Sequence, residues 1–317
     1  MREMGLEPTR RSPHAPQTCL STIPTLSQVC SSIITLPYGF VNIFFIEKQD
    51  PRLWLFYDGK YDRLSNRMCK GAAEMTRFFV SPDEMRSDFL VLTGENAVHA
   101  KVLRLKSGEQ VLICDGQGRE CVCTVSDVSP GQISLVVNST QESSSEPAVK
   151  VSVYLAFPKA DKLEHVIQKA TELGAYEIVA FPSARCVSRP DEKSLNKKLE
   201  RWQKIAASAS EQSGRGRIPQ VITLPSYADA LKRAAQADKA ILFYENERAT
   251  TLKMALQEGA YRSVSILTGP EGGLEETEVE KAQEAGLQVC TLGSRILRCE
   301  TAPLCALSAI MYDFGEF

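Results

Sequence analysis

Strand-like and helix-like segments alternate along the second half of the chain, and this alternation constrains the fold more than any other feature. Apolar, strand-like runs occur at residues 151–157, 177–181, 239–244, 263–267 and 287–292. Helical patterns separate them: one places Leu163, Val166, Ile167, Ala170 and Leu173 on a single stripe before Gly174, and a longer one covers 193–213. This alternation predicts a parallel sheet with helices on both faces, which is an α/β domain.

A small β-rich region is predicted ahead of the α/β part. Short strand-like runs lie at 88–92, 110–114, 121–128 and 133–137, with turn signals at Gly116 and Gly131 and a short helix at 97–105. Several short strands in so short a region imply a small barrel. The Ser-rich residues 140–147 are predicted to be a linker. We therefore expect a β-barrel domain at 75–146 and the α/β domain at 147–317.

The first 74 residues differ from the rest because they show no coherent periodicity. Their apolar run at 38–46 is too short to span a bilayer and contains Asn42, so no membrane segment is expected. The lack of acidic residues between Glu7 and Glu47 is a weak feature of organellar transit peptides. We favour the alternative that the folded protein begins at Met75. A cytoplasmic protein is expected, with an organelle as the alternative.

Composition argues against a metal site and against a strongly basic protein. The ten cysteines form no CxxC pair, and His14, His99 and His165 stand in no ligand spacing with them. Scattered thiols of this kind suit a reducing cytosol. The net charge is −2, so nucleic-acid binding would need a local basic patch.

Two loops at the ends of predicted strands carry the strongest signal for a ligand. In a parallel sheet, ligands bind outside the carboxyl ends of the strands. The first loop, TGPEGG at 268–273, has glycines that let the backbone approach a ligand closely. It lacks the Lys of a phosphate loop, and Glu275 and Glu276 would repel a phosphate. The loop predicts a cofactor bound without phosphates; an ordinary strand-to-helix turn is the alternative.

The second loop, LGSRILRCETA at 292–302, adds apolar residues to the predicted pocket. Ile296 and Leu297 could hold an adenine between them, while Arg295 or Arg298 faces an anionic partner. Thr301 could instead simply be the N-cap of the last helix.

Together with two further segments, these loops resemble a known family. The segments are KADKLEHVIQKATELG at 159–174 and EQSGR at 211–215. The four motifs, in this order, resemble the RsmE family of bacterial 16S ribosomal RNA uracil-N3 methyltransferases, in the SPOUT superfamily. The resemblance runs from about Met75 to the end of the chain. Departures from the family pattern are Ala160, Cys299 and Pro303, and these concern a turn and the edge of the pocket.

The resemblance implies a fold, a cofactor and partners. It implies a PUA-like β-barrel followed by a SPOUT domain with a C-terminal trefoil knot, a homodimer, and small-subunit ribosomal RNA as the substrate. It also implies S-adenosylmethionine as the cofactor. Carried over by motif, the cofactor contacts are Leu242, Tyr244, Glu245, Thr268, Gly269, Pro270, Glu271, Gly272, Leu292, Gly293, Ile296, Leu297, Arg298 and Cys299.

Uracil N3 must lose a proton before or during methyl transfer, so we expect residues that favour the anion. Arg298 could stabilise negative charge on the uracil carbonyl oxygens. Glu300 or Glu172 could accept the proton, although we favour a first-turn helix role for Glu300. His165 is expected to be structural. Candidate RNA contacts are Arg77, Arg104, Lys162, Lys169, Arg185, Arg189, Arg215 and Arg217.

Three other functions stay open at this point. A SPOUT methyltransferase acting on a different RNA would carry the same cofactor motifs. A non-catalytic RNA-binding protein would use the β-barrel alone, which the intact loops disfavour. A nucleotide-dependent oxidoreductase is disfavoured because no GxGxxG fingerprint opens the α/β region.

Overall fold

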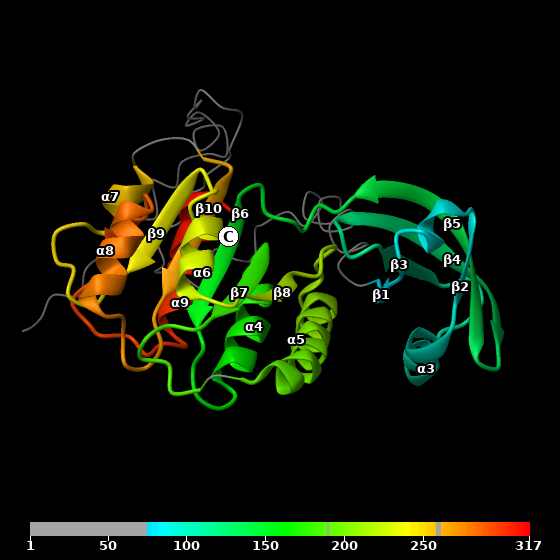
Figure 1. Cartoon of the computed structure of the whole chain (residues 1–317). Helices are drawn as coiled ribbons and strands as arrows, with labels where there is room; N and C mark the ends of the chain where they lie inside the picture. Colours follow the sequence, from blue (N-terminus) through cyan, green and yellow to red (C-terminus); the bar gives the residue numbers. More distant parts are fainter. Residues whose placement is uncertain (1–74, 189, 258–260) are drawn as a thin grey trace, which may run out of the picture. The chain divides into compact units, whose positions relative to one another are not determined.

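A six-stranded sheet forms the centre of the α/β region in the computed structural model, which describes residues 75–188, 190–257 and 261–317 (Figure 1). Its order is β11-β9-β10-β6-β7-β8, and each neighbouring pair is parallel, as predicted. Predictions for residues 1–74 and for Arg189 lie outside the described residues. The strands are β6 (Lys150–Ala156), β7 (Glu177–Phe181), β8 (Gln220–Thr223), β9 (Lys239–Phe243), β10 (Ser263–Thr268) and β11 (Gln288–Cys290).

Helices cover both faces of this sheet. Both α6 and α9 contact β6 and β10, and Figure 1 shows them on opposite faces. The predicted apolar stripe of α4 is buried, and this helix packs on α5 and α9. The helices are α4 (Lys162–Glu172), α5 (Glu192–Ser213), α6 (Tyr227–Ala234), α7 (Leu252–Leu256), α8 (Glu276–Glu284) and α9 (Ala302–Asp313).

The β-rich region folds into a five-stranded sheet of order β1-β3-β4-β5-β2. Only the β1–β3 pair is parallel; the other pairs are antiparallel. The two long strands β4 and β5 turn at Gly131, whose φ of 82° suits glycine. No ladder joins β1 to β2 among the described residues, so the sheet is a half-barrel. Its elements are β1 (Arg77–Phe79), η2 (Glu84–Arg86), β2 (Phe89–Leu92), α3 (Gly94–Val102), β3 (Gln110–Cys114), β4 (Arg119–Ser129) and β5 (Gln132–Glu142).

The predicted linker is partly wrong, because its first residues belong to a strand. Thr140–Glu142 continue β5 and pair with Cys121–Arg119 of β4. Farther along, the Glu146 carboxylate is bound by the guanidinium of Arg215. Even the Ser-rich segment is therefore held in part by specific contacts.

Each sheet has its own apolar core. The larger core lies between the parallel sheet and its helices, and includes Tyr154, Phe181 and Leu242. The smaller core lies inside the half-barrel around Phe78 and Ile113. Within the described ranges, no helix is both long and apolar enough to cross a membrane. The trefoil knot stays a prediction.

Candidate active site

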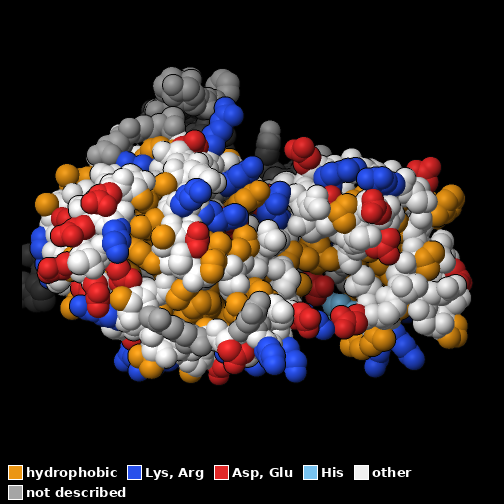
Figure 2. All heavy atoms as spheres, in the orientation of Figure 1, with side chains coloured by type: hydrophobic (Ala, Val, Ile, Leu, Met, Phe, Trp, Pro, Cys, Tyr) orange, Lys and Arg blue, Asp and Glu red, His pale blue; other side chains and the backbone are white. Residues whose placement is uncertain are grey.

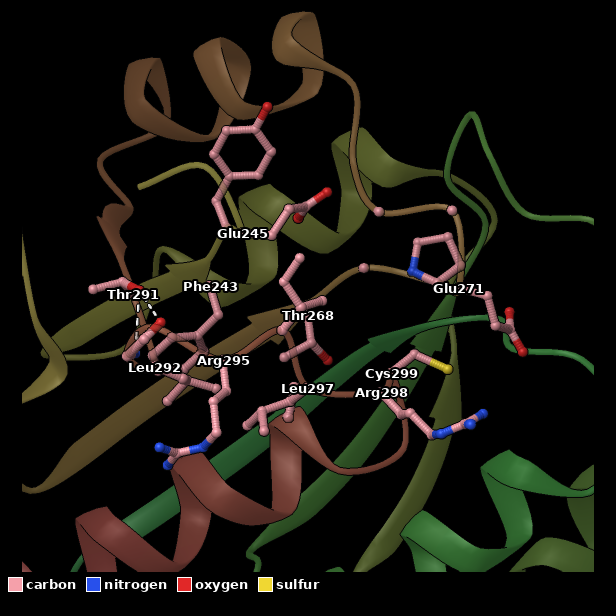
Figure 3. Close-up of a pocket in the computed structure, with 18 of the residues that line it drawn as sticks. Phe243, Glu245, Thr268, Glu271, Thr291, Leu292, Arg295, Leu297, Arg298 and Cys299 are labelled. Carbon is pink, nitrogen blue, oxygen red and sulfur yellow. Dashed lines mark hydrogen bonds between the residues drawn. The ribbon is translucent and has the colours of Figure 1, made fainter. Parts of the chain in front are cut away.

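A cavity of about 440 Å³ opens at the carboxyl ends of three neighbouring strands (Figure 3). The strands β11, β9 and β10 lie side by side and run in the same direction, so the loops that follow them meet. The loop after β10 is TGPEGG, and the loop after β11 contains Ile296 and Leu297. The cavity thus brings together the two loops on which the ligand prediction rests.

Backbone and hydroxyl contacts hold the strand ends in place. The buried Thr268 hydroxyl donates to the Tyr154 carbonyl at 3.3 Å, which ties β10 to β6. The Tyr244 N–H donates to the Cys290 carbonyl at 3.1 Å, which ties the loop after β9 to β11. The Thr291 hydroxyl contacts the N–H and the carbonyl of Gly293, each at 3.2 Å (Figure 3). The walls of the cavity are therefore connected to the sheet itself.

Gly273 makes the turn of the first loop possible. Its φ is +68°, and its N–H donates to the Pro270 carbonyl at 3.0 Å. A Cβ at this position would also collide with the Glu245 carboxylate. The backbone angle therefore favours glycine at this position, and a side chain here would also displace the exposed Glu245 carboxylate.

The second loop places apolar and cationic groups on the same cavity. Figure 3 shows Leu297 below Thr268, with the guanidinium groups of Arg295 and Arg298 pointing in different directions. Ile296 also lines the cavity and is 80% exposed, so an apolar surface is available to a ligand. Thr301 occupies the N-cap position of α9, but its side chain makes no capping hydrogen bond.

Lys162 links three segments at the edge of the cavity. Its ammonium lies 3.0 Å from Glu271 Oε1 and 3.2 Å from Glu300 Oε2. The Glu271 carboxylate also accepts the Lys159 N–H at 3.0 Å. One lysine of α4 is thus paired with both loops at once. Sequence reasoning placed Lys162 among RNA contacts and did not identify this bridge.

The same network sets the charge of the two carboxylates. Burial opposes ionisation of Glu271, but the Lys159 N–H and the Lys162 ammonium outweigh it, and the pKa is lowered. For Glu300, burial is likewise outweighed, by its own N–H, the Cys299 thiol and Lys162, so its pKa is also lowered. A carboxylate with a lowered pKa is a weaker proton acceptor. This electrostatic environment argues against Glu300 as the base.

Two assigned residues lie away from the cavity. The Glu172 carboxylate pairs with Lys169 on α4 at 2.8 Å and does not line the cavity, which removes the geometric basis for a catalytic role. Leu242 is fully buried inside β9, and its side chain belongs to the core. Conversely, Arg248 and Thr291 line the cavity although they lie outside the loops that the sequence singled out, and Gly273, Arg295 and Ala302 belong to those loops but were not among the assigned contacts.

The remaining cofactor assignments all line the cavity. They are Tyr244, Glu245, Thr268, Gly269, Pro270, Glu271, Gly272, Leu292, Gly293, Ile296, Leu297, Arg298 and Cys299.

Two predicted RNA contacts are corrected by burial and pairing. The Arg215 side chain is 4% exposed, and it pairs with Glu146 at 2.6 Å. It also donates to the carbonyls of Thr171 and Ala175, at 3.0 and 2.8 Å. The Arg77 side chain is 11% exposed and pairs with Glu120 at 3.1 Å. Both guanidinium groups are used inside the protein.

The other predicted RNA contacts have varied surroundings. Arg104 is exposed, and Lys169 is paired with Glu172. Arg185 donates to the Gly272 carbonyl at 3.1 Å, so it supports the TGPEGG loop. Arg217 donates to the Gln117 carbonyl at 2.6 Å. Among the described residues, no group of three or more His, Cys, Asp or Glu side chains is arranged to hold a metal.

Comparison with protein families matches both regions of the chain. Residues 145–311 match the family model of an RNA methyltransferase domain. Residues 92–138 match that of an RNA methyltransferase PUA domain.

Individual proteins show the same likeness. The chain is 39% identical over 250 residues to ribosomal RNA small subunit methyltransferase E of Bacillus subtilis, covering 75% of this chain and 97% of the relative. It is 34% identical over 226 residues to the protein of that name from Mycobacterium bovis, covering 69% of this chain and 85% of the relative. The crystal structure of the Neisseria gonorrhoeae protein bound to S-adenosylmethionine superposes with a TM-score of 0.65 at 28% identity, covering 75% of this chain and 98% of the other.

Proposed function

This chain belongs to the family of ribosomal RNA small subunit methyltransferase E, and we propose that it transfers a methyl group from S-adenosylmethionine to N3 of one uridine in small-subunit ribosomal RNA. The observation that carries the proposal is the cavity formed by the two motif loops at the strand ends. The Neisseria relative, whose structure contains S-adenosylmethionine, aligns with three quarters of this chain.

The residues of the cavity fit this cofactor. Its volume of about 440 Å³ lies in the range of small-molecule sites. Apolar Leu292, Ile296 and Leu297 offer a surface for an adenine, and the exposed Glu245 carboxylate suits ribose hydroxyls. When bound, S-adenosylmethionine supplies an electrophilic methyl group.

The protein's own contribution is positioning and charge. Arg298 is exposed at the cavity and can stabilise negative charge on a uracil carbonyl oxygen, which favours loss of the N3 proton. Lys162 holds Glu271 and Glu300 together, so we assign Glu300 a positioning role at the start of α9.

Further parts of the proposal concern partners and organisation. A paired uracil hides N3, so the target uridine lies in an irregular or single-stranded region. We propose a homodimer, a C-terminal trefoil knot, a domain boundary between residues 146 and 147, and a cytoplasmic location.

The test is a methyl-transfer assay with labelled S-adenosylmethionine on small ribosomal subunits that lack the modification. Naked small-subunit RNA, large subunits and transfer RNA serve as parallel substrates. We expect labelling of small-subunit RNA at a single uridine N3, located by nuclease mapping. Labelling of only another RNA would support the SPOUT alternative and overturn the proposed substrate. Absence of S-adenosylmethionine binding by calorimetry would support a non-catalytic RNA-binding protein.

A further inference from the structure

A second cavity, of about 480 Å³, lies apart from the first and shares no lining residue with it. Lys150 is the first residue of β6, and Tyr176 directly precedes β7, so both mark the amino ends of their strands. The first cavity lies at carboxyl ends. Because the strands are parallel, the two cavities lie at opposite ends of the sheet. The second cavity is therefore separate from the pocket proposed for methyl transfer.

Four cationic residues line this second cavity: Arg119, Lys150, Arg215 and Arg217. The Lys150 ammonium lies 5.1 Å from the centre of the Tyr176 ring, and the Arg217 guanidinium carbon lies 4.9 Å from it. Both cations lie within the distance at which the negative face of an aromatic ring attracts a positive charge, so Tyr176 helps to hold each of them in place. In the orientation of Figure 2, Lys and Arg side chains gather around the amino end of β6.

These cations lack acidic partners within the described part of the chain. No described carboxylate oxygen lies within 4.0 Å of the charged nitrogens of Arg119, Lys150 or Arg217. The fourth cation of the cavity, Arg215, is neutralised by Glu146. Among the described lining residues, the remaining acid is the exposed Glu142, so their positive charge is in excess. An excess of unpaired cations around a cavity favours an anionic ligand.

The backbone that carries the cations is held by hydrogen bonds. The Gly118 N–H donates to the Gly216 carbonyl at 3.2 Å, and the Ser143 N–H donates to the Gly118 carbonyl at 2.8 Å. The Glu146 carboxylate accepts the N–H groups of Gly216 and Arg217, each at 3.0 Å. The backbone around the cavity is therefore ordered before a ligand binds, which lowers the conformational entropy that the protein loses on binding.

We propose that this cavity binds phosphodiester groups of the substrate RNA, with Arg119, Lys150 and Arg217 as the phosphate contacts. The inference rests on the proposed function, since it takes the substrate RNA as the ligand. Contacts of this kind position an RNA and do not read its sequence. The cavity would anchor RNA at a distance from the target base. Sequence reasoning included Arg217 among RNA contacts but did not include Arg119 or Lys150.

The experiment uses the full-length protein with Arg119 and Lys150 both changed to Ala. Binding of small-subunit RNA is measured by filter retention at several salt concentrations. Each lost phosphate contact should reduce the slope of log K against log salt by about 0.7 to 0.9. We expect the slope to fall by about 1.4 to 1.8 in the double variant, and its KM for the RNA substrate to rise.

Matched measurements separate the site from general charge and from folding. Lys281→Ala removes an exposed lysine on α8 that lines neither cavity, and it should leave the slope unchanged. Unchanged S-adenosylmethionine affinity of the double variant shows that the fold is intact. Lys150→Glu, a second variant, should weaken RNA binding further than Lys150→Ala does.

Each outcome either supports or overturns the inference. An unchanged salt slope and KM in the double variant would overturn it. A third outcome would be that inorganic phosphate binds the unchanged protein but not the double variant, while both proteins bind RNA equally well. This outcome would identify a site for a free anion and would also overturn the inference. The salt dependence of RNA binding is measured without methyl transfer, so this part of the test stays independent if the proposed methylation fails.

Discussion

The ammonium of Lys162 lies 3.0 Å from the Glu271 carboxylate, and this contact joins helix α4 to the TGPEGG loop at the edge of the cavity. A second contact from the same ammonium reaches Glu300. Glu271 and Glu300 belong to the two loops that resemble the cofactor-binding loops of the family. Because Lys162 pairs with both, it affects the shape of the cavity from its edge.

Lys162→Met should weaken S-adenosylmethionine binding several-fold, because both loops lose their shared partner. Lys162→Arg, which keeps the charge, should bind the cofactor nearly as well as the unchanged protein. Isothermal titration of the three proteins checks this. Equal affinity in Lys162→Met and the unchanged protein would show that the bridge does not shape the pocket.

The same ion pairs predict how stability depends on pH. The pKa values of Glu271 and Glu300 are lowered from the ordinary 4.5, so their stabilising effect is present above pH 4.5 and is lost as the pH falls through their folded-state values. Lys162→Met lacks the part of this effect that comes from the two ion pairs. The difference in Tm between the unchanged protein and Lys162→Met should therefore shrink as the pH falls below 4.5. A difference that stays constant in scanning calorimetry would contradict the prediction.

Gly273→Ala should destabilise the protein and weaken cofactor binding. A side chain here is strained by the φ of +68° and also meets the Glu245 carboxylate. Gly286→Ala is the matched control, because Gly286 has a φ of +90° but no atom within 4 Å of the added Cβ. We expect a backbone cost of about 1 to 3 kcal/mol in both variants by urea unfolding. Only Gly273→Ala should lose cofactor affinity as well.

Arg298→Ala should lower turnover on ribosomal substrate by about 100-fold if the guanidinium stabilises charge on the uracil. Its affinity for S-adenosylmethionine should change little. Arg295→Ala, at the same cavity but with its side chain pointing in another direction, should retain much more activity (Figure 3). Steady-state kinetics and calorimetry together check this. Turnover of Arg298→Ala equal to that of the unchanged protein would exclude the proposed role.

Arg215→Ala should destabilise the fold by about 3 to 5 kcal/mol, because it leaves the Glu146 carboxylate without its cationic partner in a largely buried site. Arg201→Ala is the control: Arg201 pairs with Glu164, but its side chain is 65% exposed, so the loss should be about 0.5 kcal/mol. Urea unfolding measures both. If Arg215→Ala were as stable as the unchanged protein but bound RNA more weakly, Arg215 would be an RNA contact and the structural role would be wrong.

Short elements show where sequence patterns stop being informative. The strand β1 has three residues, and β8 has four, of which only Val221 is buried. Neither is long enough to show an alternation that predicts a strand. Both are strands because a longer neighbour pairs with them: β3 pairs with β1, and β7 pairs with β8.

Charged residues show a second limit. Arg77 and Arg215 resemble surface cations in the sequence, yet their acidic partners lie 43 and 69 residues away along the chain. Lys162 likewise meets Cys299 across 137 residues. No local pattern encodes such distances, so these three residues were assigned to RNA when the folded chain uses them for other contacts.

The sequence by itself determined the alternation of strands and helices, the parallel sheet and the two loops at its carboxyl ends. These features depend on residues that are near one another in the chain, through periodicity and turn chemistry. The tertiary structure alone decided which cations are neutralised and which carboxylates are held ionised at the cavity. It also decided that three cations without an acidic partner among the described residues line a second cavity. These properties arise where distant segments pack together, since burial and charge pairing depend on the folded neighbourhood of each side chain.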